Sequence, residues 1–480
     1  MTILAMPRKT SADALASFIR LQDADTLASV LIELAANHTA VNDRLVRLQL
    51  SNQPKALAQG FRKTLTAWKR STKYLGYSQA GEFGRDLETW LGQIERELMP
   101  QDPAAALALA EAFIEADDVF FNSADDSNGA VGDAVRAGCL LWLKAASRCE
   151  SPATAWPGRI LALVAADQYG AREELLRRAD LLLSEEAMRS LVVSHEANLD
   201  NGLAQPASAA ANINWPAVRA STVLHLLAEA LRDPDIMVRA VLKRSPCPNP
   251  VQKASFVEAY LKYGRPESAL PWLDGSWAHM EVSRQHLEAQ VLAALGRKDE
   301  AAVVRRRIFE ASLAVSDLHA WLDLLLPHQQ SEPIEHARTL ATAHPDPVVV
   351  ALLLMDIGDD MAAEAALTAP GAIEGGNYGT LVPLAEALEH RGLWTGATVV
   401  YRALLVAILD RGYAPAYRHG AKYWARLQAL AQKCTGLMPL EPPDEFDARL
   451  RVQHKRKTSF WAHVSGARPA GDDNQADAEA

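Results

Sequence analysis

The densest group of residues that could do chemistry lies near residue 125. It consists of Asp125, Asp126, Ser127, Asn128 and Gly129, and further carboxylates precede it between positions 115 and 118. Carboxylate and amide oxygens are the ligands that calcium and magnesium prefer in proteins. A second short polar segment, which contains Asp167 and Tyr169, follows about forty residues later and could supply further oxygens.

An EF-hand calcium loop needs oxygen ligands at its first, third and fifth positions, glycine at the sixth and glutamate at the twelfth. With Gly129 as the sixth residue, the first becomes Ala124 and the twelfth becomes Val135. The match therefore fails where charge matters most. Two interpretations stay open: the segment caps a helix that begins near Ala130, or it forms a weak divalent-ion or ligand site.

Two clusters combine basic side chains with aromatic rings. The first consists of Lys55, Arg62, Lys63, Trp68, Lys69, Arg70, Lys73 and Tyr74. The second consists of Arg449, Arg451, His454, Lys455, Arg456, Lys457, Phe460 and Trp461. Cations beside rings that can stack suit single-stranded nucleic acid or an acidic peptide. Solvated helix faces carry the same cations above buried aromatics, so all three interpretations stay open.

Motifs that would identify an enzyme are absent from the sequence. It contains no His-Glu-x-x-His, no phosphate-binding glycine loop and no dinucleotide fingerprint. The four cysteines form no Cys-x-x-Cys pair, which excludes a zinc ribbon or a disulfide framework. We therefore expect no cofactor and no metal, and a role other than catalysis.

The sequence also bears on location. The longest apolar run, 348–355, has eight residues, far fewer than the ~20 that span a bilayer. Near the start, Arg8 and Lys9 follow the first apolar residues, the reverse of a secretory signal. We expect a cytoplasmic protein with no membrane segment. The net charge of −10 disfavours a general nucleic-acid binder, which is usually basic.

The elements that must position these residues are helices with a long-range period. Glycines recur at Gly264, Gly296, Gly358 and Gly392, at separations of 32, 62 and 34 residues. Pro327 lies midway across the double interval, where a unit without its glycine would fit. Apolar residues at helical spacing precede each glycine, so each glycine is predicted to end a helix with a left-handed backbone.

An alanine follows every one of these glycines five residues later. The four are Ala269, Ala301, Ala363 and Ala397, one turn into the next helix, where a small side chain lets two helices approach closely. A period of this length indicates a solenoid of helix–turn–helix units that resembles tetratricopeptide repeats. The fold class predicted is all-α: a helical array followed by a tetratricopeptide-like solenoid.

The predicted organisation has six segments. Leucine- and alanine-rich periodicity fills both large regions, and Leu27, Leu31 and Leu34 form a clear apolar stripe. Asn, Gly, Ser and Pro enrichment indicates a linker between them. The segments are a flexible N-terminus (1–10), an N-terminal helical domain (11–200), a linker (201–216), the repeats (217–440), a basic C-terminal helix (441–465) and a disordered acidic tail (466–480).

Several short strings carry a resemblance to a known family. The string Asp125 to Gly129, the string Asp167-Gln168-Tyr169-Gly170, and the stretches Tyr413 to Leu430 and His454 to Trp461 resemble an uncharacterised family of bacterial helical proteins. A related helical region occurs in some proteins with SWIM-type zinc fingers. The likeness runs from about 11 to 464, but this chain lacks the Cys-x-Cys…Cys-x-His finger. The resemblance therefore implies a helical-repeat fold and no activity.

These observations favour a scaffold that binds an unidentified protein partner through the surface of stacked helix pairs. Two alternatives stay open. One is an enzyme or metal-binding protein that uses the segment around Asp125 to Gly129, together with Asp167. The other is an accessory protein that binds nucleic acid through the basic clusters.

Overall fold

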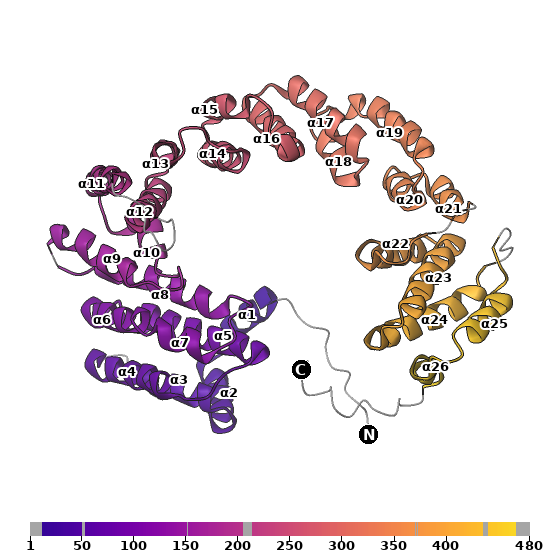
Figure 1. Cartoon of the computed structure of the whole chain (residues 1–480). Helices are drawn as coiled ribbons and strands as arrows, with labels where there is room; N and C mark the ends of the chain where they lie inside the picture. Colours follow the sequence, from indigo (N-terminus) through magenta and orange to yellow (C-terminus); the bar gives the residue numbers. More distant parts are fainter. Residues whose placement is uncertain are drawn as a thin grey trace. The chain divides into compact units, whose positions relative to one another are not determined.

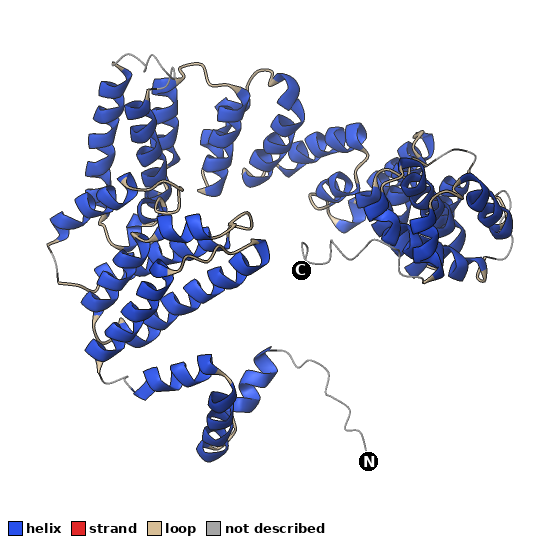
Figure 2. Ribbon diagram, turned by 60° about the horizontal axis from the view of Figure 1, so that its bottom comes forward, coloured by secondary structure: helices blue, strands red, loops and turns tan. Residues whose placement is uncertain are grey.

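The computed structural model of the chain describes residues 12–49, 53–150, 152–204, 214–369, 371, 373–434 and 440–466. Within these residues the protein is all-α, with 26 α-helices and no strand (Figures 1 and 2). The predicted all-α class is confirmed. The predicted flexible segment 1–10 lies outside the described residues, as does the predicted tail 466–480 apart from Gly466.

The chain divides into two compact units, Met1–Cys247 and Pro248–Ala480. Helices of the first unit are α1 (Ala12–Arg20), α2 (Ala24–Asn37), α3 (Thr39–Gln49), α4 (Pro54–Arg70), α5 (Tyr77–Gln93) with a π-helical end η1 (Ile94–Leu98), α6 (Pro103–Ile114), α7 (Asp117–Ser123), α8 (Ala130–Ala146), α9 (Trp156–Ala165), α10 (Glu174–Arg177), α11 (Glu185–Leu203), α12 (Trp215–Leu231) and α13 (Pro234–Arg244).

Helices of the second unit are α14 (Pro250–Lys262), α15 (Pro266–Ala269), α16 (Glu281–Ala294), α17 (Lys298–Ser312), α18 (Val315–Leu322), α19 (Ser331–Ala343), α20 (Pro347–Asp356), α21 (Asp360–Thr368), α22 (Tyr378–His390), α23 (Trp394–Arg411), α24 (Tyr417–Ala431), α25 (Pro443–Gln453) and α26 (Thr458–Ser465).

The units do not divide at the predicted linker 201–216. Helices α11 and α12 on its two sides pack along each other, and the Asn214 side-chain amide donates to the Gly202 carbonyl. A Cβ at position 202 would lie 2.8 Å from the Ala217 nitrogen, so only glycine allows this close approach. Residues 205–213 lie outside the described residues. The division falls instead between Cys247 and Pro248.

The four periodic glycines end their helices as predicted. Their φ angles are 69°, 76°, 80° and 77° in chain order, all in the left-handed region. At Gly296, the Arg297 amide donates to the Leu292 carbonyl at 2.9 Å, and the Gly296 amide donates to Ala293 at 3.0 Å. The other three glycines repeat this pair of bonds. Each turn is therefore a Schellman motif, which satisfies carbonyls at the helix end.

The alanines that follow these glycines are fully buried. Ala269, Ala301, Ala363 and Ala397 each expose 0% of their surface, as expected for small residues between closely packed helices. A fifth turn of the same kind precedes them. Arg232 lies 32 residues before Gly264 and has φ 52°, and the Asp233 amide donates to the Ala228 carbonyl at 2.9 Å.

The position midway across the double interval differs from the other turns. Pro327 begins a short 3-10 turn (Pro327–Gln329) between α18, which has only eight residues, and α19. Helix α18 packs on α17 and α20, and α19 packs on α20. Helices thus flank Pro327, but the glycine-type turn is replaced because the proline ring fixes φ near −65°.

Neighbouring helix pairs are joined by polar contacts as well as by apolar packing. The Glu364 carboxylate on α21 accepts from the Thr395 and Gly396 amides at the start of α23, both at 2.9 Å. The Arg391 guanidinium donates to the Met355 carbonyl at 2.7 Å. The α20–α21 pair therefore caps and anchors the α22–α23 pair.

The predicted single basic helix 441–465 is two helices, α25 and α26, separated at His454. Helix α25 begins with the acidic residues Asp444 and Glu445, which are favourable near a helix N-terminus. Helix α26 packs on α24 and buries Phe460 completely. The chain turns at His454 because this packing brings α26 back against the core.

Candidate functional site

The acidic segment 125–129 caps helix α8. The Asp126 carboxylate accepts from the Val131 amide at 2.7 Å and from the Gly132 amide at 3.0 Å, one oxygen for each. Gly129, with φ 76°, turns the chain so that Asp126 lies over the first amides of the helix. These contacts are those of a helix cap, and the negative charge is also favourable at the positive end of the helix dipole.

The neighbouring polar residues of this segment bond within their own turn. Asp125 accepts from the Ser127 hydroxyl at 2.5 Å and from the Ser127 amide at 3.2 Å. The hydroxyl hydrogen bond, followed by the amide hydrogen bond, lowers the pKa of the Asp125 carboxyl. The Asn128 side-chain oxygen accepts from the Ala130 amide at 3.1 Å. Each of these oxygens thus has a structural partner within the segment.

The second predicted segment forms a similar turn around Asp167. One carboxylate oxygen accepts from the Tyr169 and Gly170 amides, both at 3.0 Å, and the other accepts from the Arg172 amide at 2.8 Å. Gly170 has φ 79°, which the turn requires. Asp167 therefore organises its own loop.

Helix α7 brings the two predicted segments together. The ring of Tyr169 stacks on Phe121 with centroids 4.2 Å apart, and its hydroxyl donates to the Asn122 side chain at 3.4 Å. Helix α7 ends at Ser123, immediately before the acidic segment. Tyr169 remains 43% exposed, so this contact lies at the surface of the unit.

A buried ion pair that the sequence analysis missed holds this arrangement. The Arg172 guanidinium donates to both oxygens of Asp117 at 2.7 and 2.6 Å. Asp117 exposes 0% of its surface and Arg172 exposes 4%, and the hydrogen bonds to Asp117 raise the pKa of the guanidinium. Because the pair is closed to solvent, it anchors the Asp167 loop to the start of α7.

Two arginines of the C-terminal basic cluster are paired with neighbouring carboxylates. Arg449 donates to the Glu441 carboxylate at 3.0 and 2.8 Å, and Arg451 donates to Asp447 at 2.9 Å. The Arg451 guanidinium also lies over the Trp461 ring, 4.7 Å from its centroid. Both arginines therefore take part in ion pairs within the unit.

The remaining members of this cluster differ in exposure. His454 is buried, which lowers the pKa of its imidazole, and its Nε2 lies 3.5 Å from the Asp410 carboxylate. The Trp461 indole donates to the His454 carbonyl at 3.0 Å. Lys457 is half-buried, whereas Lys455 and Arg456 are exposed. The cluster thus offers fewer available cations than its sequence suggests.

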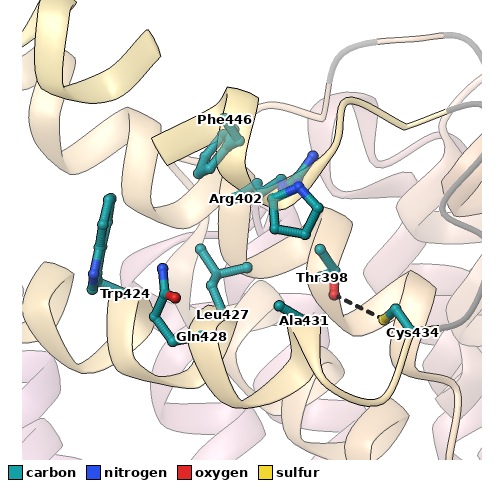
Figure 3. Close-up of a pocket in the computed structure, with 9 residues that line it drawn as sticks. Thr398, Arg402, Trp424, Leu427, Gln428, Ala431, Cys434 and Phe446 are labelled. Atoms are coloured by element: carbon teal, nitrogen blue, oxygen red, sulfur yellow. Dashed lines mark hydrogen bonds between the residues drawn. The ribbon is translucent and has the colours of Figure 1, made fainter. Parts of the chain in front are cut away.

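A small cavity of about 20 Å³ lies among α23, α24 and α25 (Figure 3). Its lining includes Arg402, Trp424 and Phe446, and the Thr398 hydroxyl lies 3.7 Å from the Cys434 sulfur beside it. Burial lowers the pKa of Arg402, whose guanidinium donates to the Glu441 carbonyl at 2.8 Å. The cavity has room for about one water molecule, which excludes a metabolite.

The described part of the chain has neither a cluster of metal ligands nor a membrane-spanning helix. No three His, Cys, Asp or Glu side chains there gather closely enough to hold a metal ion. None of the helices there is both long and apolar enough to cross a bilayer.

Comparison with known proteins places the chain in a family. A model described as a family of unknown function, DUF6880, matches residues 16–463, from α1 into α26. No curated protein and no solved structure matches the chain. The extent of the family match agrees with the resemblance to an uncharacterised family that the sequence strings carry. The chain therefore belongs to the DUF6880 family, whose function is unknown.

Proposed function

We propose that this protein is a protein-binding scaffold built on a tetratricopeptide-like solenoid. The observation that carries the proposal is the repeated helix pair, with its left-handed glycine and its fully buried alanine five residues later. A single pair of this kind cannot bury its own apolar face, so pairs stack. Stacked pairs present extended surfaces on which other proteins dock.

The three N-terminal helices support a protein partner. Helix α2 buries none of its residues, and the predicted stripe residues Leu31 and Leu34 are 41% and 40% exposed. Large apolar side chains exposed on α1 to α3 are Leu15, Phe18, Ile19, Val30, Leu31, Ile32, Leu34 and Val46. Large apolar side chains exposed in this number on three consecutive helices are typical of a protein interaction surface.

The contacts of the polar segments favour the scaffold over the enzyme alternative. Asp125, Asp126 and Asp167 each accept hydrogen bonds that order a turn or cap a helix. Each carboxylate thus has a structural role that requires neither a metal nor a substrate.

The proposal is tested by affinity capture from the source organism, carried out with and without nuclease. We expect a protein partner in fixed ratio to the full chain, lost when Leu31 and Leu34 are both changed to glutamate. A matched control changes Val282 and Met361 to glutamate. These residues are 61% and 75% exposed in the second unit, and this variant should keep the partner.

The same experiment separates the alternatives. Capture that nuclease abolishes would favour a nucleic-acid role. A chain that is captured alone, and whose melting temperature rises with a divalent cation, would favour the metal-dependent role. Either result contradicts the scaffold.

A further inference from the structure

The inference concerns the exposed face of helix α4, which carries the first basic cluster. The opposite face of α4 buries Leu57, Phe61 and Leu65, and the helix packs on α6, α7 and η1. The sequence of α4 contains no aspartate or glutamate. Charges on its exposed face are therefore of one sign.

Five cations follow this face and a sixth lies just beyond the helix. All six are exposed: Lys55, Arg62, Lys63, Lys69, Arg70 and Lys73. At 100° per residue the five helical cations fall within a sector of roughly 120°. Among the described residues no carboxylate forms an ion pair with any of the six, in contrast to Arg449 and Arg451 at the other cluster. We call these six residues the α4 basic strip.

The strip has a regular spacing. Lys55, Arg62 and Lys69 follow one another at intervals of seven residues, and Lys63 and Arg70 repeat the interval beside them. Seven residues advance a helix by roughly 10 Å and turn it by only about 20° from a straight row. Two parallel rows of cations thus lie along the exposed face of α4. A second helix with carboxylates at every seventh residue would match their spacing.

Of the two aromatic rings that the sequence places among these cations, that of Trp68 faces inward, whereas Tyr74, beyond the end of α4, is 64% exposed. Trp68 is half-buried and packs edge-on against Phe83 and Trp90, with centroids 6.1 and 5.7 Å apart. Binders of single-stranded nucleic acid combine a basic groove with open rings. Six cations lie beside one open ring, that of Tyr74. In a chain of net charge −10, the seven-residue spacing of these cations favours an acidic helical segment of a protein.

We propose that the α4 basic strip docks an acidic helical segment of a partner protein, with Asp or Glu at seven-residue spacing. This assignment rests on the proposed scaffold function and names the chemistry of a partner surface. The ion pairs are exposed, so the interaction weakens as salt concentration rises and increases the association rate more than it increases affinity.

The test uses the purified full chain and two labelled peptides of three heptads with identical composition. One peptide has glutamates at seven-residue spacing, and the other has them scrambled. Fluorescence anisotropy at low salt should show tighter binding of the regular peptide. The Arg62→Glu/Lys69→Glu double variant should bind it about tenfold more weakly, since two exposed pairs are lost and replaced by repulsion.

A matched control is the Lys298→Glu/Arg307→Glu double variant, which changes net charge by the same amount at exposed positions of helix α17 in the second unit. It should bind the regular peptide within about twofold of the parent. Circular dichroism melts confirm that both variants fold. Equal binding of the two peptides, or an equal loss in the control, overturns the proposal.

Labelled oligothymidylate provides a further arm. If it bound more tightly than the regular peptide and lost affinity in the Arg62→Glu/Lys69→Glu variant, the strip would be a nucleic-acid site and the proposal would be wrong. The titration needs no native partner. If no partner is captured but the regular peptide binds as expected, the scaffold function is rejected and the α4 basic strip is not. If a partner is captured but the peptide does not bind as expected, only the assignment of the α4 basic strip is rejected.

Discussion

The left-handed turns predict that replacing glycine with alanine changes the free energy of unfolding in opposite directions at two sites. Gly296 lies at a helix end with φ 76°. Gly60 lies inside α4 and has no positive φ. A Cβ at either position would meet no atom within 4 Å. Alanine at the two sites therefore differs only in backbone conformation.

The magnitudes follow from this difference. Alanine at 296 is held in a left-handed conformation that costs about 1–2 kcal/mol, partly offset by about 0.4–1 kcal/mol from a less flexible unfolded chain. The net loss is about 1 kcal/mol. Asparagine tolerates this conformation better and should lose less. Alanine at 60 should stabilise by about 0.5–1 kcal/mol, because glycine inside a helix is unfavourable.

At Arg232 the opposite kind of substitution, to glycine, tests the same argument. It has φ 52° in the same motif, and its side chain is exposed. Glycine there relieves about 1–2 kcal/mol of strain and costs about 0.5–1 kcal/mol in unfolded-state entropy. We expect a net gain of about 0.5–1 kcal/mol.

The assay is urea unfolding with hydrogen exchange of the affected helix ends, since a chain of two units does not unfold in one two-state step. Exchange of the amides of residues 296 and 297 should quicken in Gly296→Ala, and exchange of the amides of residues 232 and 233 should slow in Arg232→Gly, because these amides donate the hydrogen bonds of the two turns. If asparagine at 296 cost as much as alanine, or if glycine at 232 destabilised the protein, the conformational argument would be refuted.

Four further predictions concern packing, the cap, the buried pair and pH. Ala301→Leu should cost about 1–3 kcal/mol in a urea melt, because the site is fully buried and leucine over-packs it. Asp126→Ala should lower stability by about 0.5–2 kcal/mol, a cap's contribution, and millimolar calcium, magnesium or manganese should change the melting temperature of neither form. Arg172→Met should cost about 3–5 kcal/mol, because it leaves the Asp117 carboxylate buried and unpaired. The pKa of His454 in the folded chain lies below its ordinary value of 6.5, so the unfolded chain binds the proton more readily. The contribution of this group to the free energy of unfolding is therefore full above pH 6.5 and is lost as pH falls through the folded pKa. His454→Gln should remove this loss in melts between pH 8 and 5.

Each of these has a result that would contradict it. Parent-like melting of Ala301→Leu would reject the helix crossing. A metal-dependent rise in melting temperature that Asp126→Ala abolished would turn the cap into a cation site. If Asp117→Leu combined with Arg172→Met were no more stable than Arg172→Met alone, the unpaired carboxylate would not be the cause. An unchanged pH profile in His454→Gln would assign the acid loss to other groups.

Local rules account for the parts of the fold that the sequence predicted. Gly296 and Gly358 end helices in the left-handed conformation that glycine favours, so the spacing of such glycines predicts where the helices end. The apolar run 348–355 lies just before Gly358 and forms helix α20, as the prediction that this glycine ends a helix requires. The same rule missed the turn at Arg232, because a non-glycine residue occupies the left-handed position there.

Long-range contacts account for the rest. Asp117 and Arg172 are 55 residues apart, and nothing in either neighbourhood indicates that they pair. Composition predicted a linker at 201–216, where two helices pack closely around Gly202. Charge counting overstated the C-terminal cluster because Glu441, just ahead of α25, binds Arg449. Such partners are set by tertiary packing.

Helix α17 determines how far a local opening can spread through the second unit. Its residues Ala301, Val304 and Ile308 join a small cluster with α16, whereas Ala302 and Phe309 belong to the large cluster that continues to Phe460. In the proposed solenoid, cooperativity passes only between neighbouring helix pairs. Since α17 contributes to both clusters, weakening either of its faces would split one unfolding transition into two, with the first helices of the unit melting independently of the rest.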